Sequence, residues 1–324
     1  MKTRQLGYTD LHLSVIGFGS FALGGGGWKF SWGPQDDRDS VNAIVRAVEV
    51  GVNWIDTAPV YGFGHSEEVV GLALKRCSRK PFVATKCGSL WDGSGNIFRR
   101  TRKASVREEV EASLRRLGVD VIDLYQMHWP LPDEEFEEGW ETMAQLVKAG
   151  KVRYLGVSNF NVAQMERLQA IHPIASLQPP YSMLCRDIES EILPYCGRHH
   201  VGVVAYSPLE KGLLTGKFSL ERIKNLAPED HRRNDPMFAE PQLSAILELT
   251  QGLERLAKEH HMTVAELALA WVLRRPELTA AIVGARRPGQ IEETASAADK
   301  VLSPETVQAI EGLLDKRNKT LATH

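Results

Sequence analysis

The sequence predicts an α/β protein, a (β/α)8 TIM barrel with an N-terminal β-hairpin and extra C-terminal helices. Short apolar segments alternate with amphipathic segments along nearly the whole chain, which is typical of strands followed by helices. The apolar segments number eight, the strand number of such a barrel. A length of 324 residues suits one barrel, because these barrels often exceed about 250 residues. We therefore expect a single domain over residues 1–324.

The expected strands are short and apolar, as strands buried on both faces of a parallel sheet should be. They are Val15–Gly19, Asn53–Thr57, Phe82–Lys86, Ile122–His128, Arg153–Val157, Ser176–Pro179, Val201–Tyr206 and Thr279–Val283. Amphipathic helical patterns lie between them, several entered through an N-capping Ser, Asp or Asn and left through Gly. They include Ser40–Val50, Ser66–Arg76, Ala104–Leu117, Glu134–Ala149 and Val162–Ile171.

Other segments are extra to the barrel. Thr3–Ser14 alternates polar and apolar residues, which predicts a hairpin. After the seventh strand, Ser207–Pro241 is expected to be a long loop. Further helical patterns lie at Gln242–His260, Thr263–Arg274 and Pro304–Leu314. In such a barrel, function is expected on the loops at the carboxyl ends of the strands.

A doubly wound dinucleotide-binding sheet is the competing α/β architecture. Gly17–Ala22 fits its G-x-G-x-x-A fingerprint directly after a strand. That fingerprint requires a helix to begin there, and residues 23–34 are instead rich in Gly and aromatic side chains. Gly212–Lys217 is one residue too short for a P-loop and lacks the Ser or Thr that should follow Lys. We interpret both matches as loop sequence.

The charge is balanced, with 39 Lys and Arg against 41 Asp and Glu. Such a chain has no overall basic field for nucleic acid or an anionic membrane, so a small molecule is the expected partner. No secretory signal and no apolar stretch of about 18 residues occurs, which indicates the cytoplasm. Reduced thiols and no metal site are expected, because the cysteines lack CxxC spacing; they are Cys77, Cys87, Cys185 and Cys196. An oligomer stays possible.

Four polar residues fall where the second, third and fourth strands should end. They are Asp56, Tyr61, Lys86 and His128. Because adjacent barrel strands end side by side, Lys86 should touch Asp56 and Tyr61 and lower the pKa of the phenol. Tyr61 would then be a usable proton donor, and His128 would orient a carbonyl oxygen. Each alone is better explained as a structural residue, but the four together favour a catalytic site.

Several motifs, in order along the chain, are similar to those of the aldo-keto reductase superfamily. They are Asp56-Thr-Ala-x-x-Tyr61-Gly, Ser66-Glu67-Glu68, Thr85-Lys86, His128-Trp-Pro, Gly150-Lys-Val-Arg-x-x-Gly-Val-Ser158-Asn159-Phe160 and Tyr206-Ser-Pro208-Leu209. The resemblance covers essentially the whole chain. It is nearest to bacterial NADP-dependent sugar- and inositol-locus reductases and more distant to potassium-channel β subunits. It implies that the catalytic tetrad of the family falls on Asp56, Tyr61, Lys86 and His128.

The resemblance also implies NADP as cofactor. The nicotinamide would lie against Tyr206, with its carboxamide on Ser158, Asn159 and Gln178. The residues implied around the pyrophosphate are Ser207, Leu209, Gly212, Leu214 and Lys217. Those implied around the adenosine 2′-phosphate are Gly284, Arg286, Gln290, Glu293 and Thr294, with Arg286 as the phosphate partner. Thr294 stands where the family commonly has Asn, which weakens its assignment to adenine.

Together these residues predict hydride transfer between NADP(H) and an aldehyde or ketone, either a sugar or a small carbonyl compound, with Tyr61 as general acid. The aromatic side chains expected to wall the substrate pocket are Trp28, Trp32, Trp91 and Trp129. The alternative is a nicotinamide-binding regulatory subunit similar to potassium-channel β subunits. A metal-dependent hydrolase is disfavoured, because the expected strands carry no His-x-His. The physiological substrate and the direction of reaction stay open.

Overall fold

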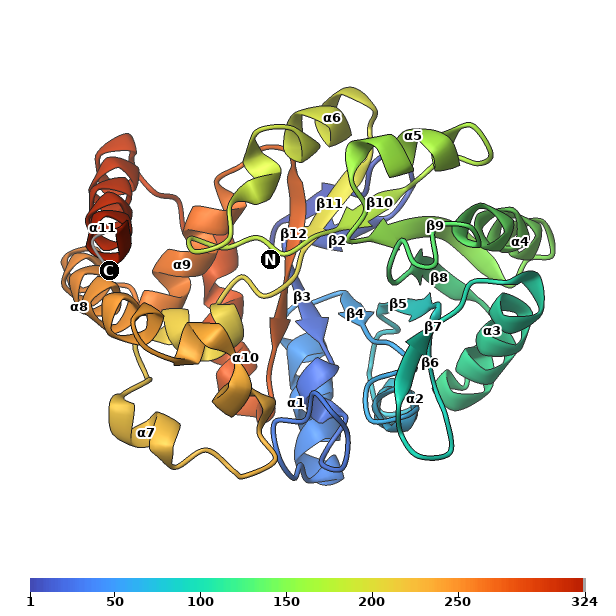
Figure 1. Cartoon of the computed structure of the whole chain (residues 1–324), viewed down its shortest axis with the longest axis horizontal. Helices are drawn as coiled ribbons and strands as arrows, with labels where there is room; N and C mark the ends of the chain where they lie inside the picture. The colour runs from blue at the N-terminus through green and yellow to red at the C-terminus, as the bar shows by residue number, and fades with distance from the viewer. Residues whose placement is uncertain (323–324) are drawn as a thin grey trace.

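In the computed structural model, which describes residues 1–322, eight parallel strands close into a barrel (Figure 1). Their order around the barrel is β10, β11, β12, β3, β4, β5, β8, β9. The strands are β3 (Ile16–Gly19), β4 (Trp54–Asp56), β5 (Phe82–Cys87), β8 (Ile122–Met127), β9 (Val152–Ser158), β10 (Ser176–Gln178), β11 (Gly202–Ala205) and β12 (Leu278–Gly284). Every end agrees with the predicted strand to within one residue, so the (β/α)8 prediction is confirmed.

Helices surround the barrel (Figure 1). Those that follow the first six barrel strands are α1 (Asp37–Glu49), α2 (His65–Leu74), α3 (Lys103–Leu117), α4 (Phe136–Lys148), α5 (Val162–Gln169) and α6 (Ile192–Arg198). Local sequence explains several ends. Asp36 caps α1 by accepting a hydrogen bond from the Asp39 amide, and Asn161 forms a capping box with Gln164 at α5. Gly118 ends α3 in the left-handed conformation.

The C-terminal part adds α8 (Gln242–Glu259), α9 (Val264–Leu273), α10 (Pro288–Ala295) and α11 (Pro304–Ala322). All ten residues of α9 are buried, as in a helix packed on every side. The predicted last helix ended at Leu314, but α11 continues to Ala322. Lys316 pairs with Glu248 at 2.6 Å, and Arg317 bonds Gln242 at 2.7 Å, so α8 holds these last turns. Residues 323 and 324 of the expected domain lie outside the described residues.

The predicted N-terminal hairpin is present as β1 (Thr3–Gln5) paired with β2 (His12–Ser14). Leucines 6, 11 and 13 of this hairpin pack with Trp54, Ala84 and Leu124 inside the barrel, so the hairpin plugs its amino end. Gly7 has a positive φ, and a Cβ there would lie 2.5 Å from a backbone oxygen of the segment before β11. The turn therefore requires glycine.

The segment predicted as a long loop contains short helices, η3 (Glu210–Thr215), α7 (Leu220–Lys224), η4 (His231–Asn234) and η5 (Pro236–Phe238). Ser219, Asp230 and Asp235 cap three of them through side-chain oxygens. A second hairpin, β6 (Ser89–Trp91) with β7 (Ile97–Arg99), was also not predicted. The remaining short turns are η1 (Phe21–Leu23), η2 (Asp187–Glu189) and η6 (Ser296–Asp299).

The dinucleotide fingerprint at Gly17–Ala22 is explained by packing. A Cβ at Gly17 would lie 2.1 Å from ring atoms of Trp54, so this glycine makes room for the barrel core. After β3 the chain forms only the short η1 turn, and no α-helix begins before Asp37. Within the described part of the chain, none of the helices is long and apolar enough to cross a membrane.

Candidate active site

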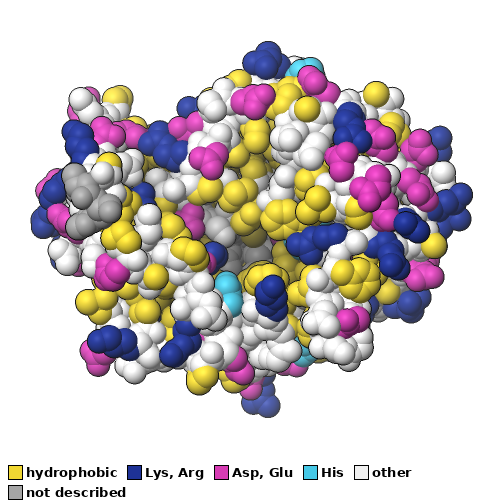
Figure 2. Space-filling model, in the orientation of Figure 1, with side chains coloured by type: hydrophobic (Ala, Val, Ile, Leu, Met, Phe, Trp, Pro, Cys, Tyr) yellow, Lys and Arg dark blue, Asp and Glu magenta, His cyan; other side chains and the backbone are white. Residues whose placement is uncertain are grey.

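A cavity of about 930 Å³ lies at the carboxyl ends of the barrel strands. Figure 2 shows this face of the molecule hollowed near its centre, with hydrophobic side chains around the opening. Ligand pockets commonly measure about 300–1,000 Å³, so this one can hold a large ligand. Three of the four predicted catalytic residues, Asp56, Tyr61 and His128, line it.

Lys86 lies fully buried beneath the cavity and touches two of the other predicted catalytic residues. Its Nζ is 2.6 Å from Asp56 Oδ2 and 3.3 Å from the Tyr61 hydroxyl. It also donates to the backbone oxygen of Thr57 at 2.9 Å. Burial alone lowers the pKa of the Lys86 ammonium, but Asp56 and Tyr61 outweigh it and raise that pKa. Lys86 is therefore a cation held against a carboxylate and a phenol.

The pKa of Tyr61 differs from the prediction. The sequence predicts a lowered value, whereas in the structure burial raises the pKa of Tyr61 above its ordinary value. The Lys86 charge works in the predicted direction but is outweighed, because removing the phenolate from water costs more than the ammonium recovers. The predicted lowering is therefore wrong for this state of the protein, and Tyr61 carries its proton at neutral pH.

His128 completes the quartet as a neutral imidazole. Its ring centroid lies 6.0 Å from that of Tyr61 in an edge-on arrangement. Burial lowers the pKa of His128 well below its ordinary value, and the charges of Lys86 and Arg99 add to this effect. The Nδ1 atom is buried without a hydrogen-bond partner in the described part of the chain. A neutral imidazole can still donate one hydrogen bond to a ligand.

The second oxygen of Asp56 is held by two amides. Gln178 Nε2 donates to Asp56 Oδ1 at 2.8 Å and to Gln126 Oε1 at 3.0 Å, while Gln126 Nε2 reaches the same carboxylate oxygen at 3.2 Å. The sequence analysis missed Gln126. The signal was present, because Gln126 is a polar residue in an apolar strand and lies two positions before His128, on the same face.

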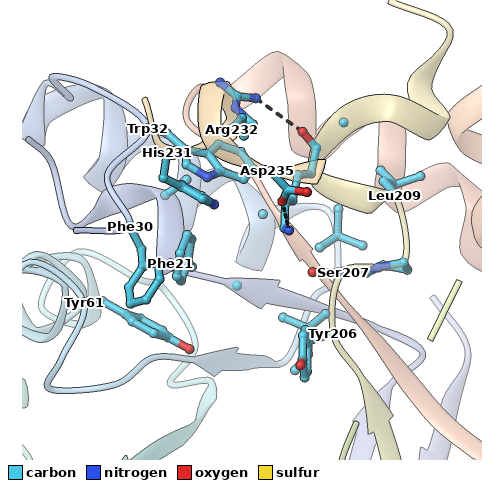
Figure 3. A pocket seen from close by; sticks show the side chains of 18 of the residues that line it. Phe21, Phe30, Trp32, Tyr61, Tyr206, Ser207, Leu209, His231, Arg232 and Asp235 are labelled. Atoms are coloured by element: carbon cyan, nitrogen blue, oxygen red, sulfur yellow. Dashed lines mark hydrogen bonds and ion pairs between the residues drawn. The ribbon is translucent and has the colours of Figure 1, made fainter. Parts of the chain in front are cut away.

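A chain of hydrogen bonds links the residues predicted to hold the nicotinamide. The Tyr206 hydroxyl donates to Asn159 Oδ1 at 2.9 Å, Asn159 Nδ2 donates to Ser158 Oγ at 3.0 Å, and Ser158 Oγ donates to the Gln178 backbone at 2.8 Å. All four residues line the cavity. Figure 3 shows Tyr206 across the pocket from Tyr61. The side chains that would contact a nicotinamide are thus already positioned.

Most of the other predicted cofactor residues also line the cavity, namely Ser207, Leu209, Gly212, Lys217, Gly284, Gln290, Glu293 and Thr294. Leu214 does not, because it is fully buried in the main hydrophobic core. The segment after β11 carries positive φ angles at Ser207, Glu210 and Lys211 as well as at Gly212. Such backbone strain clusters at ligand sites, and backbone amides exposed by such turns suit an anion. The residues present therefore fit a dinucleotide.

Arg286, the predicted phosphate partner, is directed elsewhere. Its Nε donates to Gln35 Oε1 at 2.5 Å and its Nη1 to the Trp32 backbone oxygen at 3.2 Å, and it also bonds the Pro34 oxygen. It is not among the cavity-lining residues. The adjacent Arg287 is exposed and makes no side-chain hydrogen bond or ion pair with the described residues.

The expected aromatic wall is present in part. Trp28, Trp32 and Trp129 line the cavity, whereas Trp91 does not. Trp91 packs on Phe63 at 5.5 Å between ring centroids, so its expected place in the pocket is wrong. Further lining aromatic residues that were not predicted are Phe21, Phe30, Phe218 and His231. Figure 3 shows Phe21 and Phe30 beside Tyr61.

Comparison with known proteins agrees with this geometry. Residues 16–315 match the aldo/keto reductase family. The chain is 39% identical over 318 residues to aldo-keto reductase YhdN of Bacillus subtilis (strain 168), covering 97% of this chain and 94% of that protein. It is 36% identical over 332 residues to the NADH-specific methylglyoxal reductase of Escherichia coli (strain K12), covering 96% of this chain and 100% of that protein.

A solved structure is similar over almost the whole fold. The glycerol dehydrogenase AKR11B4 from Gluconobacter oxydans superposes with a TM-score of 0.89 at 40% identity, covering 98% of this chain and 96% of that chain. Aldo-keto reductases are oxidoreductases that use nicotinamide cofactors. With a family match over most of its length and close relatives in sequence and structure, the chain belongs to the aldo/keto reductase family.

Proposed function

We propose that this protein is an NADP(H)-dependent reductase of aldehydes or ketones in which Tyr61 is the general acid. The observation that carries the proposal is the position of Lys86 Nζ, which lies 2.6 Å from Asp56 and 3.3 Å from the Tyr61 hydroxyl beneath the cavity. A buried cation beside a phenol stabilises the negative charge that develops when the phenol gives up its proton.

A nicotinamide bound against Tyr206 supplies or accepts the hydride, and the chain handles the proton. In the reducing direction the Tyr61 hydroxyl gives its proton to the carbonyl oxygen, which has gained the electron pair of the C=O bond. Asp56 keeps Lys86 charged and in place. His128, as a neutral imidazole, donates a hydrogen bond that orients the carbonyl oxygen.

The substrate class follows from the pocket and the relatives. The Escherichia coli relative is a methylglyoxal reductase and the Gluconobacter relative is a glycerol dehydrogenase, so small oxygenated carbonyl compounds or sugars are the proposed substrates here. The aromatic side chains that line the opening, Trp28, Phe30 and Trp129, offer faces to the C–H groups of such molecules.

The preference for NADP over NAD is proposed from charge. Arg286 and Arg287 lie at the start of α10, whose N-terminus favours a phosphate. An NADH-specific relative exists, so this preference needs a direct test. We further propose that residues 1–324 act as one barrel domain in the cytoplasm.

Turnover assays across short aldehydes, aromatic aldehydes and sugars test the proposal, with the loss of reduced-nicotinamide absorbance as the signal. The rival function, a nicotinamide-binding regulatory subunit, predicts cofactor binding with little turnover of any carbonyl. The intact quartet favours the enzyme. Tight NADPH binding without measurable carbonyl reduction would overturn the reductase and favour the regulatory subunit.

A further inference from the structure

The hairpin β6–β7 brings a cation to the substrate side of the cavity. It follows β5, and three of its residues, Ser89, Ile97 and Arg99, line the pocket. In the ring of eight strands, β5 lies opposite β11, which leads into Tyr206 and the proposed cofactor segment. Arg99 therefore faces the reacting groups from the side that the cofactor residues leave open.

The guanidinium of Arg99 lacks an anionic partner. Its side chain makes no hydrogen bond or ion pair with any residue in the described part of the chain, and its Nε is buried without a partner. The group is half buried, and burial lowers the pKa of Arg99 with no carboxylate acting against this effect. A partly desolvated guanidinium without an acceptor is costly, which indicates that a ligand supplies one.

The other buried or half-buried cations that line the cavity already have acceptors. Lys211 pairs with Asp235, and Arg232 pairs with Asp230. Lys217 is exposed and pairs with Glu293. Figure 3 shows Asp235 and Arg232 joined to their neighbours by dashed lines. Arg222 and Lys29 are also exposed, and Arg222 donates to a backbone oxygen at 2.8 Å. Among the described lining residues, Arg99 is thus the partly buried cation left for a ligand.

A row of neighbouring rings connects Arg99 to the reacting groups. The guanidinium carbon lies 5.2 Å from the Trp129 ring centroid, and the Trp129 ring stacks on His128 at 6.2 Å. His128 in turn contacts Tyr61 at 6.0 Å between centroids. The contact with Trp129 uses none of the guanidinium N–H groups as hydrogen-bond donors to the described residues, so they remain available to a ligand. Arg99 and Tyr61 line the same cavity and are connected by these neighbouring rings, so one ligand in the cavity can contact both.

We propose that the substrate carries an anionic oxygen group, a carboxylate or a phosphate ester, that pairs with Arg99 while its carbonyl lies at Tyr61. This assignment rests on the proposed reductase function and narrows it. Arg99 presents a planar fork of donors, which suits both groups. A carboxylate and a phosphate ester would each place an oxyanion at one end of a short aldehyde or ketone.

Matched substrate pairs test this proposal. We would compare kcat/KM for succinic semialdehyde with butanal, and for glyceraldehyde phosphate with glyceraldehyde, which separates carboxylate from phosphate. Wild type should favour the anionic member of at least one pair by roughly 10- to 150-fold, the range of a charge-assisted contact. Arg99→Met should remove that preference and change the neutral member only a few-fold. Arg99→Lys should keep part of it.

Arg100→Met is the matched control, because Arg100 is the exposed neighbour on the same hairpin and does not line the cavity. It should keep the wild-type preference. Equal turnover of both members by wild type, or an equal loss for both in Arg99→Met, overturns the anion site while the reductase stands. Thermal unfolding of each variant excludes a folding defect.

A binding measurement separates failure of this inference from failure of the proposed function. Succinate and glycerol phosphate carry the anion but no reactive carbonyl. Calorimetric titration in the presence of cofactor should detect binding of at least one to wild type and to Arg100→Met, with at least about tenfold weaker binding to Arg99→Met. If no carbonyl is reduced but this difference appears, the anion site stands and the reductase fails. Equal affinity, or no binding to wild type, overturns the site.

Discussion

Gln178 donates a 2.8 Å hydrogen bond from its side-chain amide to Oδ1 of Asp56. The residue proposed to hold the nicotinamide carboxamide thus touches the carboxylate that holds Lys86. The other oxygen of Asp56 lies 2.6 Å from Lys86 Nζ. The proposed cofactor contact and the proposed proton donor are therefore linked through one buried carboxylate, so we expect a change at Gln178 to alter the reaction as well as cofactor binding.

Tyr61→Phe should lower kcat by at least about 100-fold, because the ring stays but the proposed proton donor is lost. The Tyr61 hydroxyl accepts a hydrogen bond from Lys86 and makes none with the residues proposed to hold the cofactor. Cofactor affinity, measured by fluorescence titration, should therefore change by no more than a few-fold. Single-turnover rates that keep more than about a tenth of the wild-type value would show that another group is the acid.

Lys86→Met should destabilise the protein as well as slow it. The change leaves the Asp56 carboxylate buried without its cation, and breaking a buried pair in this way costs about 3–5 kcal/mol. Chemical denaturation gives the free energy of unfolding. The double variant Asp56→Asn/Lys86→Met should recover part of the loss, because neither charge of this buried pair remains. A single variant as stable as wild type would mean that Lys86 does not compensate Asp56.

The barrel was predictable because its strands are short apolar runs separated by amphipathic helical patterns, which indicate the number of strands and their positions along the chain. The hairpin that carries Arg99 was not predicted from the sequence. Its strands Ser89–Trp91 and Ile97–Arg99 have three residues each, are partly exposed and show no clear alternation of polar and apolar residues. Asp56 and Lys86 were found from their place at strand ends. Gln126 lies deeper in the barrel than His128, within the strand rather than at its end, so nothing in the sequence beyond its polar side chain indicated that it belongs to the site.

The direction of the Arg286 side chain could not be predicted from the sequence around residue 286. Its guanidinium bonds Gln35, which is 251 residues earlier in the chain. Local patterns carry no information on such a contact, because it forms only when the loop after β3 and the turn after β12 meet on adjacent strands. The predicted phosphate role of Arg286 rested on the resemblance of its segment to the family and stays a proposal.

Removing the two arginines at α10 should weaken NADPH more than NADH. The double variant Arg286→Ala/Arg287→Ala loses both cations proposed to meet the 2′-phosphate, so we expect roughly 10- to 150-fold weaker NADPH binding and NADH within a few-fold. Titrations of the two single variants with NADPH and NADH show how much each arginine contributes to NADPH binding. Arg287→Ala should weaken NADPH binding more than Arg286→Ala, because the guanidinium of Arg286 already donates hydrogen bonds to residues 32–35. Equal losses for both cofactors would rule out a phosphate contact here.

Glu109 should make stability depend on pH. Burial raises the pKa of Glu109 to about 8 from its ordinary value of 4.5, although the Gly88 amide and the Ser105 hydroxyl both donate to it. Because the folded-state pKa is raised, its stabilising contribution is full below the unfolded-state pKa and is lost as pH rises through about 8. Wild type should therefore lose stability across this range relative to Glu109→Gln, by on the order of a few kcal/mol.

Thermal unfolding of both proteins at the two ends of this pH range measures that difference. An amide at position 109 can still accept from Gly88 through its oxygen and place its nitrogen toward Ser105, so the fold should be kept. Parallel pH profiles for the two proteins would show that Glu109 ionises normally in the folded state.

Gln126 should act as a positioning residue for cofactor binding. Its Oε1 accepts from Gln178 and its Nε2 donates to Asp56. With one N–H group of Gln178 donating to Gln126 Oε1 and its amide also donating to Asp56 Oδ1, Gln178 Oε1 is left to accept from a carboxamide. Gln126→Leu removes this orientation, so cofactor affinity should fall by roughly 2- to 13-fold, the value of one hydrogen bond. The loss should be the same at every pH.

Gln126→Glu separates positioning from simple packing. When protonated, the new side chain can donate to Asp56 Oδ1 and accept from Gln178, as the native amide does. When ionised, it places a second carboxylate beside Asp56, and the like charges repel. Cofactor affinity of this variant should therefore approach the wild-type value at low pH and fall as pH rises, while Gln126→Leu stays uniformly weak. If Gln126→Glu binds cofactor with a pH profile parallel to that of Gln126→Leu, the amide only fills space and does not orient Gln178.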